Sequence, residues 1–422
     1  MSLVKTSLLN GIAVAIKLAT ALVLNKVLAI YVGPTGYAII GQFQNVVSIL
    51  VSLAGGLVAT GVTKSTAQHF DDEAKQHKVW QTAIRFSLGA SILAGLVLLL
   101  VGARLSEWLL HRADMSSIFI WLALALPAMA ANNLLLAIVN GKKEVGVYIA
   151  SNIIGSLVSL VLIGMLAYYF DLYGALLAFT ISPAVVLLST AALVARRAWF
   201  KSPFLWGKMD VSLTRELSGF ALMGLTSALV VPVSYMLIRD HLALRLGLPA
   251  AGFWQASWKI SEMYLMLTTT TLSVYYLPRL AEIRTAPELK AEIIKVYRFV
   301  MPLVVIGAIT IYLLRDFIIR TLFTEDFYPM RELFAWQLTG DCIKIGSWVF
   351  AYIMVGRSMV RVFVFTEITF SLFFVFLSWW LVDLFGLSGV SIAYVINYSI
   401  YWIALAGYMR FEIKKIEFYN SF

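Results

Sequence analysis

Residues 8–30, LLNGIAVAIKLATALVLNKVLAI, form an apolar run long enough to cross a membrane as one α-helix. Lys17 lies about ten residues from either end, so at ~1.5 Å of rise per residue its Cα is about 13 to 15 Å inside the hydrocarbon. A lysine side chain cannot reach the interface from that depth, whereas Lys26, nearer the far end, can. Lys17 therefore faces other protein or water, and a cation held at mid-membrane usually marks a polar pathway.

The composition of the whole chain is that of a polytopic membrane protein. Of its 422 residues, 61% are hydrophobic and only 13% are charged, and the mean hydropathy is +0.86. The single cysteine, Cys342, excludes intramolecular disulfides and cysteine-based zinc sites. The first apolar segment is too long for a cleavable signal peptide, so we expect it to remain in the protein.

Apolar segments of roughly 20 residues recur along the chain and predict an all-α protein with twelve transmembrane helices. The expected spans are 7–31, 37–62, 80–103, 116–140, 147–170, 173–195, 214–239, 250–278, 294–314, 329–355, 361–382 and 387–410. The basic break at 196–215 separates two sets of six. This division predicts an N-terminal lobe of residues 1–200 and a C-terminal lobe of residues 201–422.

The distribution of positive charge predicts the orientation. With both termini in the cytoplasm, 21 of the 33 Lys and Arg residues fall in inner loops and tails, and six fall in outer loops. Because inner loops of membrane proteins are enriched in Lys and Arg, this orientation is strongly favoured over its inverse. The net charge of +10 is therefore a property of topology, and we expect no nucleic-acid partner.

Two of the expected helices, 250–278 and 329–355, carry charged and amide side chains at matching positions. The spacing i, i+4, i+7 places three such residues on one face of each helix. These residues are Gln255, Lys259 and Glu262 on the first helix, and Gln337, Asp341 and Lys344 on the second. We expect both faces to be buried in protein or to line a cavity.

Two interpretations of these faces stay open. In the first, Lys259 with Asp341 and Glu262 with Lys344 form neutralising structural pairs, within or between helices. In the second, the same groups line a pathway and exchange partners or protons during transport, since a carboxylate deprived of water binds protons more readily.

Other side chains give weaker signals. The amides of Gln42, Asn45, Gln255 and Gln337 are candidate sugar contacts, with interhelical hydrogen bonding as the alternative. The four histidines lack metal-ligand spacing. The sequence also lacks a phosphate-binding loop, a nucleophile elbow and a paired-carboxylate loop, so we expect no catalytic residue, no metal and no cofactor.

Five motifs carry a resemblance to a known family over the whole chain. They are MSLVKTSLLNGIAVAIK at 1–17, YVGPTGYAIIGQFQN at 31–45, VTKSTAQ at 62–68, SVYYLPRLAEI at 273–283 and RELFAWQLTGDCIKIG at 331–346. The chain resembles the Wzx-type polysaccharide flippases of the multidrug, oligosaccharidyl-lipid and polysaccharide exporter superfamily. Within that family the resemblance is closest to flippases that serve enterobacterial common antigen (lipid III) and to O-antigen translocases.

The resemblance implies two six-helix lobes in a V around a central cavity, in the bacterial inner membrane. It implies that an undecaprenyl-pyrophosphate-linked oligosaccharide moves from the cytoplasmic to the periplasmic leaflet by alternating access. The expected partners are this glycolipid, membrane lipids, and the periplasmic polymerase and chain-length regulator, and the expected state is a monomer.

The family also implies a basic cavity for the pyrophosphate. The five cations Lys17, Lys26, Arg239, Lys259 and Lys344 fill this role, against two intramembrane acids, Glu262 and Asp341. A net positive cavity favours an anionic headgroup. A cation-coupled drug or metabolite antiporter of the same superfamily would have an acid-rich cavity. A membrane glycan polymerase or ligase would have a long periplasmic loop, whereas the longest outer loop expected here has about fifteen residues.

Overall fold

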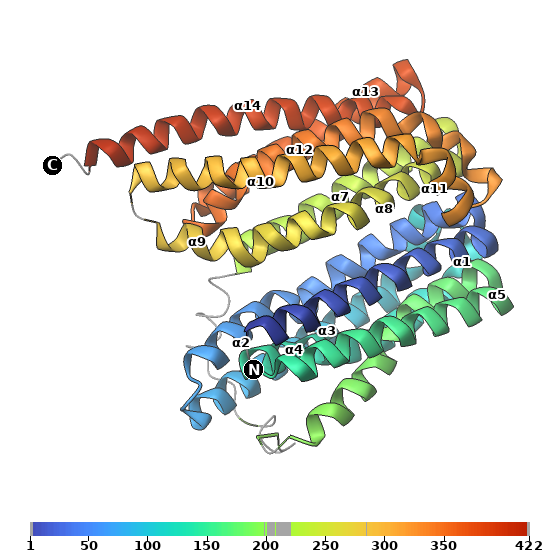
Figure 1. The fold of residues 1–422 in the computed structure, drawn as a ribbon. Coiled ribbons are helices and arrows are strands. Elements are labelled where there is room, and N and C mark those ends of the chain that lie inside the picture. Colours follow the sequence, from blue (N-terminus) through green and yellow to red (C-terminus); the bar gives the residue numbers. More distant parts are fainter. Residues whose placement is uncertain (1–2, 198, 201–206, 208–220, 284, 420–422) are drawn as a thin grey trace. The chain divides into compact units, whose positions relative to one another are not determined.

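The computed structural model describes residues 3–197, 199–200, 207, 221–283 and 285–419. All regular elements in these residues are helices, as the hydropathy of the sequence predicts (Figure 1). Contacts divide the chain into two compact units: unit 1, Met1–Pro232, and unit 2, Val233–Phe422. The division expected from the sequence, between residues 200 and 201, adjoins residues outside the described part of the chain.

Unit 1 is built from long helices that turn back on one another. In chain order they are α1 (Leu3–Val51), η1 (Ser52–Gly56), α2 (Leu57–Gln68), α3 (Glu73–Leu110), η2 (Ala113–Met115), α4 (Ser117–Gly141) and α5 (Val145–Ala195), and α7 (Ala221–Leu246) crosses into unit 2. Helix α1 reverses at Gly33, whose φ of 61° suits glycine, followed by Pro34. Helix α5 reverses at Phe170 and Asp171. Helix α4 packs against α3 and α5, and α1 packs against α5.

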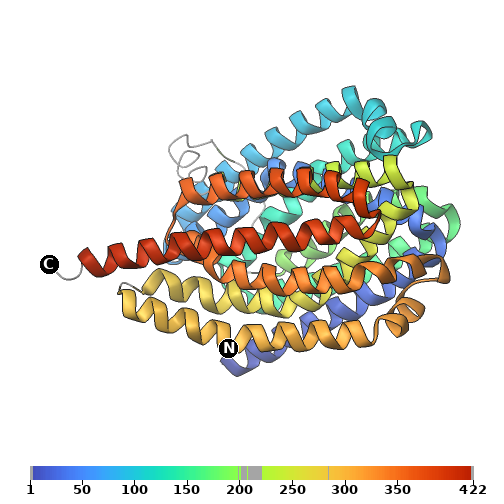
Figure 2. The ribbon, with the colours of Figure 1, turned by 90° about the horizontal axis from the view of Figure 1, so that it is seen from above.

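Unit 2 continues with a second group of helices. They are α8 (Leu248–Thr271), η4 (Leu272–Tyr276), α9 (Leu277–Glu282), α10 (Ala286–Leu313), α11 (Arg315–Leu322), η5 (Glu325–Leu333), α12 (Phe334–Gly356), α13 (Val360–Phe385) and α14 (Ser388–Tyr419). Helix α14 lies along α12 and α13, and α10 packs against α12 (Figures 1 and 2). Their buried apolar side chains form one core that includes Ile345, Val349 and Leu405.

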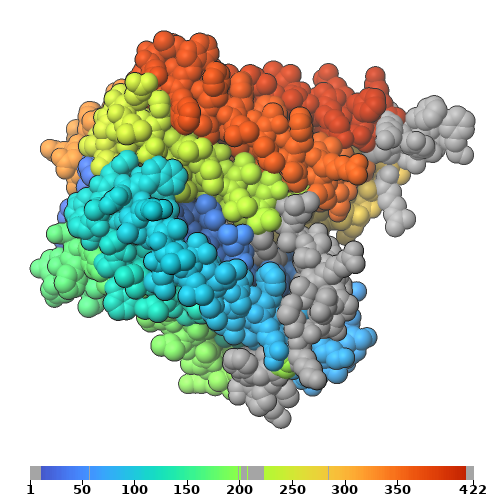
Figure 3. Space-filling model, turned by 180° about the vertical axis from the view of Figure 1, so that it is seen from behind, coloured from blue at the N-terminus to red at the C-terminus, as the bar shows by residue number. Residues whose placement is uncertain are grey.

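Nine of the described helical segments are long and apolar enough to cross a membrane. Two of them, Gly11–Gln68 and Val145–Ala195, run for 58 and 51 residues and contain the reversals at Gly33 and Asp171. Large apolar side chains are exposed on the outside, as on α3, where Leu93 and Leu100 are 65% and 83% exposed. Figure 3 shows one face of the molecule, with α3 in light blue. Such a surface suits lipid, and the chain is a multi-pass membrane protein. The number of twelve crossings stays a prediction.

The two units repeat the same turns 215 residues apart. After α4, Lys143 has a φ of 57°, and after α12, Ser358 has a φ of 54°. Both turns have the same backbone hydrogen bonds: Lys142 to Ile138 and Lys143 to Asn140 in the first, Arg357 to Ile353 and Ser358 to Val355 in the second. A further 28 residues on, Asp171 and Gly386 have φ values of 47° and 60°. The units are therefore structural repeats, a common architecture among transporters.

The repeat includes two glycines that no other residue can replace without backbone movement. A Cβ on Gly174 would lie 1.9 Å from the carbonyl oxygen of Leu166, and a Cβ on Gly389 would lie 2.1 Å from that of Leu381. We expect Gly174→Ala and Gly389→Ala each to destabilise the protein by about 1 to 3 kcal/mol, because the carbonyl is backbone and must shift. Thermal unfolding of the purified protein in detergent measures this loss.

The matched control is Gly89→Ala in α3, where a Cβ would meet no atom within 4 Å. This change should be neutral or stabilising, since alanine favours helix over glycine by about 1 kcal/mol. Equal stability of all three variants would contradict the close packing at these two turns.

Candidate functional site

In unit 2, the carboxylate of Asp341 on α12 is fully buried and accepts three hydrogen bonds from hydroxyl groups. Ser261 Oγ and Tyr264 Oη of α8 donate to Oδ2 over 2.6 and 3.0 Å, and Tyr394 Oη of α14 donates to Oδ1 over 3.0 Å. Within the described residues, no Lys or Arg nitrogen lies within 4.0 Å of this carboxylate. Hydroxyl donors from two other helices therefore satisfy it in place of a cation.

Lys344, one turn further along α12, is only 8% exposed and is surrounded by aromatic rings. Its Nζ lies 4.7 Å from the ring centre of Trp258, 4.9 Å from Trp348, 5.4 Å from Tyr398 and 5.7 Å from Tyr394. We call these four rings the aromatic cage. Ring faces attract a cation within about 6 Å, so the cage stabilises the buried ammonium group.

The three other charged residues of unit 2 that the sequence predicted for the site have partners on their own or a neighbouring helix. Lys259 pairs with Glu262 on its own helix at 2.9 Å, and this pair is partly exposed. Arg239 of α7 is 3% exposed, donates to Gln255 Oε1 over 2.6 Å and stacks on Trp254. The expected pairs of Lys259 with Asp341 and of Glu262 with Lys344 are therefore replaced by a pair within α8, the three hydroxyl groups and the aromatic cage.

The prediction that one face of α12 is buried is confirmed, because Gln337 and Asp341 are 1% and 0% exposed. Gln337 donates to Ser261 Oγ and accepts from Ser391 Oγ, so its amide joins helices. A small pocket of about 160 Å³ lies beside these groups. Its lining includes Trp258, Ser261, Glu262, Asp341, Lys344 and Trp348.

In unit 1, Lys17 lines a larger pocket of about 420 Å³ between α1, α4 and both halves of α5, which we call the polar pocket. Its lining residues are Lys17, Thr20, Ala21, Leu24, Asn132, Asn133, Leu136, Ser151, Asn152, Gly155, Ser156, Ser159, Leu160, Pro183 and Val186. The side chain of Lys17 is exposed here, as expected for a mid-membrane cation that faces water or polar groups. Amide and hydroxyl groups make up most of the other polar lining.

These amides and hydroxyls were not among the site residues predicted from the sequence. Asn132-Asn133 interrupts an apolar helix, and positions 151, 152, 155, 156 and 159 place small or polar residues on one side of α5. That stripe is the signal that would have found the pocket. The other amides expected to contact sugar on α1 lie elsewhere: Gln42 is 3% exposed and lines none of the pockets described here, and neither does Asn45. Lys26 is half-buried on α1.

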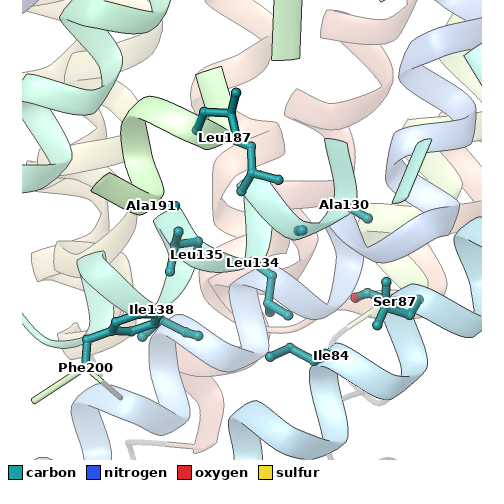
Figure 4. Close-up of a pocket in the computed structure, with 12 residues that line it drawn as sticks. Ile84, Ser87, Ala130, Leu134, Leu135, Ile138, Leu187, Ala191 and Phe200 are labelled. Carbon is teal, nitrogen blue, oxygen red and sulfur yellow. The ribbon is translucent and has the colours of Figure 1, made fainter. Parts of the chain in front are cut away.

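A second pocket of unit 1, which we call the apolar pocket, has a volume of about 400 Å³. It lies between α3, α4 and the second half of α5, and Figure 4 shows Ile84, Leu134 and Leu187 around it. Ser87 supplies the one side-chain oxygen in its lining. The polar and apolar pockets use different faces of α4: Asn132, Asn133 and Leu136 line the first, and Ala130, Ala131, Leu134, Leu135 and Ile138 line the second.

Comparisons with known proteins agree with this architecture. A family model described as polysaccharide biosynthesis protein matches residues 27–332. The lipid III flippase of Escherichia coli (strain K12) is 34% identical over 413 residues, which cover 96% of this chain and 98% of that protein. The lipid III flippase of Shigella flexneri matches to the same extent.

Among solved structures, an inward-facing multidrug resistance MATE family transporter of the MOP superfamily is similar with a TM-score of 0.79. It is 16% identical in sequence, and the match covers 95% of each chain. An outward-facing structure of such a transporter has a TM-score of 0.66 at 16% identity, covering 96% of each chain. At this identity the likeness establishes the fold, an all-helical transporter fold of two lobes.

The hydroxyl donors around Asp341 lead to a test of its role. We expect Asp341→Asn to destabilise the protein by about 1 to 3 kcal/mol. The amide N–H₂ is a donor, so it would face a buried hydroxyl donor in place of the carboxylate oxygen that accepts from it. Adding Lys259→Gln or Lys344→Gln should not restore stability, since neither ammonium lies within 4.0 Å of the carboxylate. Thermal unfolding in detergent measures both effects.

The control is Asp383→Asn, at a partly exposed ion pair with Arg245, which should change stability by less than about 0.5 kcal/mol. Recovery of wild-type stability in either double variant would show that a lysine, rather than the hydroxyl groups, is the partner that matters.

Proposed function

Because the chain belongs to the polysaccharide biosynthesis protein family, we propose that it is a flippase for a lipid-linked oligosaccharide. The observation that carries this proposal is the 34% identity to the lipid III flippase over 98% of that protein's length. The substrate is an undecaprenyl-pyrophosphate carrying a short glycan, either lipid III or an O-antigen unit. It moves from the cytoplasmic to the periplasmic leaflet and leaves chemically unchanged, so the protein is a transporter and not an enzyme.

Lys17 is the cation best placed to bind the pyrophosphate. A pyrophosphate that enters a partly dehydrated cavity loses hydration that fixed positive charge must replace. Lys259 is already paired with Glu262, and Arg239 and Lys344 are buried against aromatic rings. Lys17 is exposed in a pocket lined by amides and hydroxyls. Lys26 lies on the same helix, nearer its periplasmic end in the predicted orientation. It attracts the headgroup as the headgroup moves outward.

Transport proceeds by alternating access, with the headgroup shielded by protein and the lipid tail left in the bilayer. Each unit has its own apolar core, which suits movement as a rigid body: Trp80 and Ile138 belong to that of unit 1, and Ile345 and Val349 to that of unit 2. The direction of transport comes from consumption of the released substrate by later steps, or from an ion gradient. Glu262 and Asp341 are the acids available for ion coupling.

The charge of the polar pocket separates this function from that of a drug or cation antiporter with the same fold. Among the described residues, its lining holds one lysine and no acidic residue, which favours an anionic substrate. The protein resides in the inner membrane as a monomer with both termini in the cytoplasm. It delivers its product to the periplasmic polymerase and chain-length regulator.

The first test is transport by the purified protein in liposomes. A labelled lipid-linked oligosaccharide should cross the bilayer unchanged, and Lys17→Ala should slow its transport about tenfold or more, as expected for loss of a charge-assisted hydrogen bond. Lys17→Arg should keep part of the activity because the charge remains. Lys78→Ala, an exposed lysine at the start of α3, is the control. Wild-type transport by Lys17→Ala would remove this residue from the site.

Double electron-electron resonance, which measures distances between pairs of spin labels, tests alternating access. Labels at Arg104 of unit 1 and Arg315 of unit 2 should show two distance populations whose ratio changes with substrate. A pair within unit 1, at Arg104 and Tyr169, should show one constant distance. A single fixed distance for the first pair under all conditions would count against movement of the units.

A further inference from the structure

The geometry points to a saccharide subsite in unit 1: the polar pocket binds the sugar next to the pyrophosphate, through Asn132 and Ser151, while Lys17 holds the phosphate. This inference rests on the proposed function and adds to it the side chains that bind the glycan. Three observations support it: two buried polar atoms without partners, the chemical character of the lining, and a comparison with the repeat in unit 2.

Two polar side chains in the pocket are buried without hydrogen-bond partners. Asn132 is 7% exposed and Ser151 is 1% exposed, and both line the pocket. In the part of the chain that the structure describes, Asn132 Oδ1 and Ser151 Oγ have no hydrogen-bond partner. An unsatisfied buried polar atom costs about 1 to 3 kcal/mol, so a partner from outside the protein, such as a water or a ligand, would stabilise each of them. A ligand hydroxyl donates to Asn132 Oδ1, and Ser151 Oγ both donates and accepts.

The neighbouring side chains suit a ligand rich in hydroxyl groups. Asn152 and Ser156 hydrogen-bond backbone carbonyls of α5, which leaves the Asn152 Oδ1 and the lone pairs of Ser156 Oγ to accept from a ligand. The volume of about 420 Å³ lies within the roughly 300 to 1,000 Å³ of small-ligand pockets. Because the described residues of the lining include no carboxylate, they do not favour a cationic drug or a metal ion.

The repeat shows that this space is not a requirement of the fold. Counting 215 residues onward, Gly155 corresponds to Phe370 and Val186 to Tyr401. In unit 1 a Cβ on Gly155 would lie 3.2 Å from Val186 Cγ1, and in unit 2 the rings of Phe370 and Tyr401 are 4.8 Å apart. The same two positions therefore face each other in both units, which confirms the correspondence at this site.

Three of the other corresponding positions also carry rings in unit 2, whereas Asn132, Ser151, Asn152 and Ser156 correspond to Ser347, Thr366, Glu367 and Ser371. Small or polar residues in unit 1 are replaced by rings in unit 2: Asn133 by Trp348, Ser159 by Phe374 and Pro183 by Tyr398. Tyr398 in turn packs on Tyr401, at 6.1 Å between ring centres. Aromatic side chains thus stand in unit 2 at several positions that line the open pocket of unit 1. The open pocket is a property of the sequence of unit 1, as expected for a binding site.

The position of the pocket places it where a glycolipid headgroup begins its passage. Asn132 lies nine residues before the end of α4 at Gly141, and Ser151 lies six residues after the start of α5 at Val145. With the predicted orientation, both ends are cytoplasmic, so the pocket lies in the cytoplasmic half of the membrane. Lys17, Thr20, Ala21 and Leu24 share one face of α1, which aligns the cation with the same pocket.

The test compares two ligands on the purified full-length protein. The first is polyprenyl pyrophosphate with its oligosaccharide, and the second is the same polyprenyl pyrophosphate without sugar. Ser151→Ala and Asn132→Leu should each weaken binding of the glycolipid about threefold to tenfold, the value of one hydrogen bond, and leave binding of the sugar-free lipid unchanged. Lys17→Ala should weaken binding of both.

Ser87→Ala is the matched control. Ser87 is a serine of unit 1 that is 2% exposed and likewise has no hydrogen-bond partner in the described residues, but it lines the apolar pocket. This variant should bind both ligands as the wild type does, and thermal unfolding should show that all variants are folded.

The outcomes separate this inference from the proposed function. Wild-type protein that binds neither lipid would overturn the proposed function and the subsite with it. Wild-type protein that binds the glycolipid, with unchanged affinity in both Ser151→Ala and Asn132→Leu, would overturn the subsite alone. An equal decrease in affinity for both ligands in these variants would also overturn the subsite. The side chains would then contribute to phosphate binding or to the stability of the fold, and not to sugar binding.

Discussion

The three hydroxyl groups that converge on Asp341 illustrate the constraint on which the structure depends. Inside a hydrocarbon layer, every polar group must find its partner within the protein. In unit 2 the carboxylate of Asp341 meets this requirement with three hydroxyl donors, and Lys344 meets it with the aromatic cage. Unit 1 meets it incompletely around the polar pocket. The two sites therefore differ: the Asp341 carboxylate has its partners within the protein, whereas Asn132 Oδ1 and Ser151 Oγ of the polar pocket have none in the described residues.

Much of the fold could be predicted from the sequence because hydropathy and helical period act locally. The apolar runs and the buried face of Gln337 and Asp341 follow from spacing along one helix. The partners of those charges could not be predicted. Whether Asp341 meets Lys259 or Ser261 depends on the rotation and register of α8 against α12, and spacing within each helix does not contain that information.

The polar pocket escaped prediction for a related reason. Asn132, Ser151 and Lys17 come from three helices, and each is an ordinary residue in its own segment. Their significance arises from convergence, and from the absence of the rings that stand at corresponding positions of unit 2. The repeat became visible through backbone geometry, at Lys143 and Ser358, rather than through residue identity. A duplicated framework has thus preserved its turns while its side chains diverged.

Helix α4 presents amides to one pocket and aliphatic side chains to the other, so a single element forms a wall of both. A rigid helix cannot turn about its axis by one residue, about 100°, without changing both spaces at once. For an amphiphilic cargo this couples the two pockets. Any rotation that weakens binding of the hydrophilic end in the polar pocket also changes the shape of the apolar pocket beside it. Rotation of helix α4 would then couple release of the hydrophilic end of the molecule to a change in the surroundings of its apolar end.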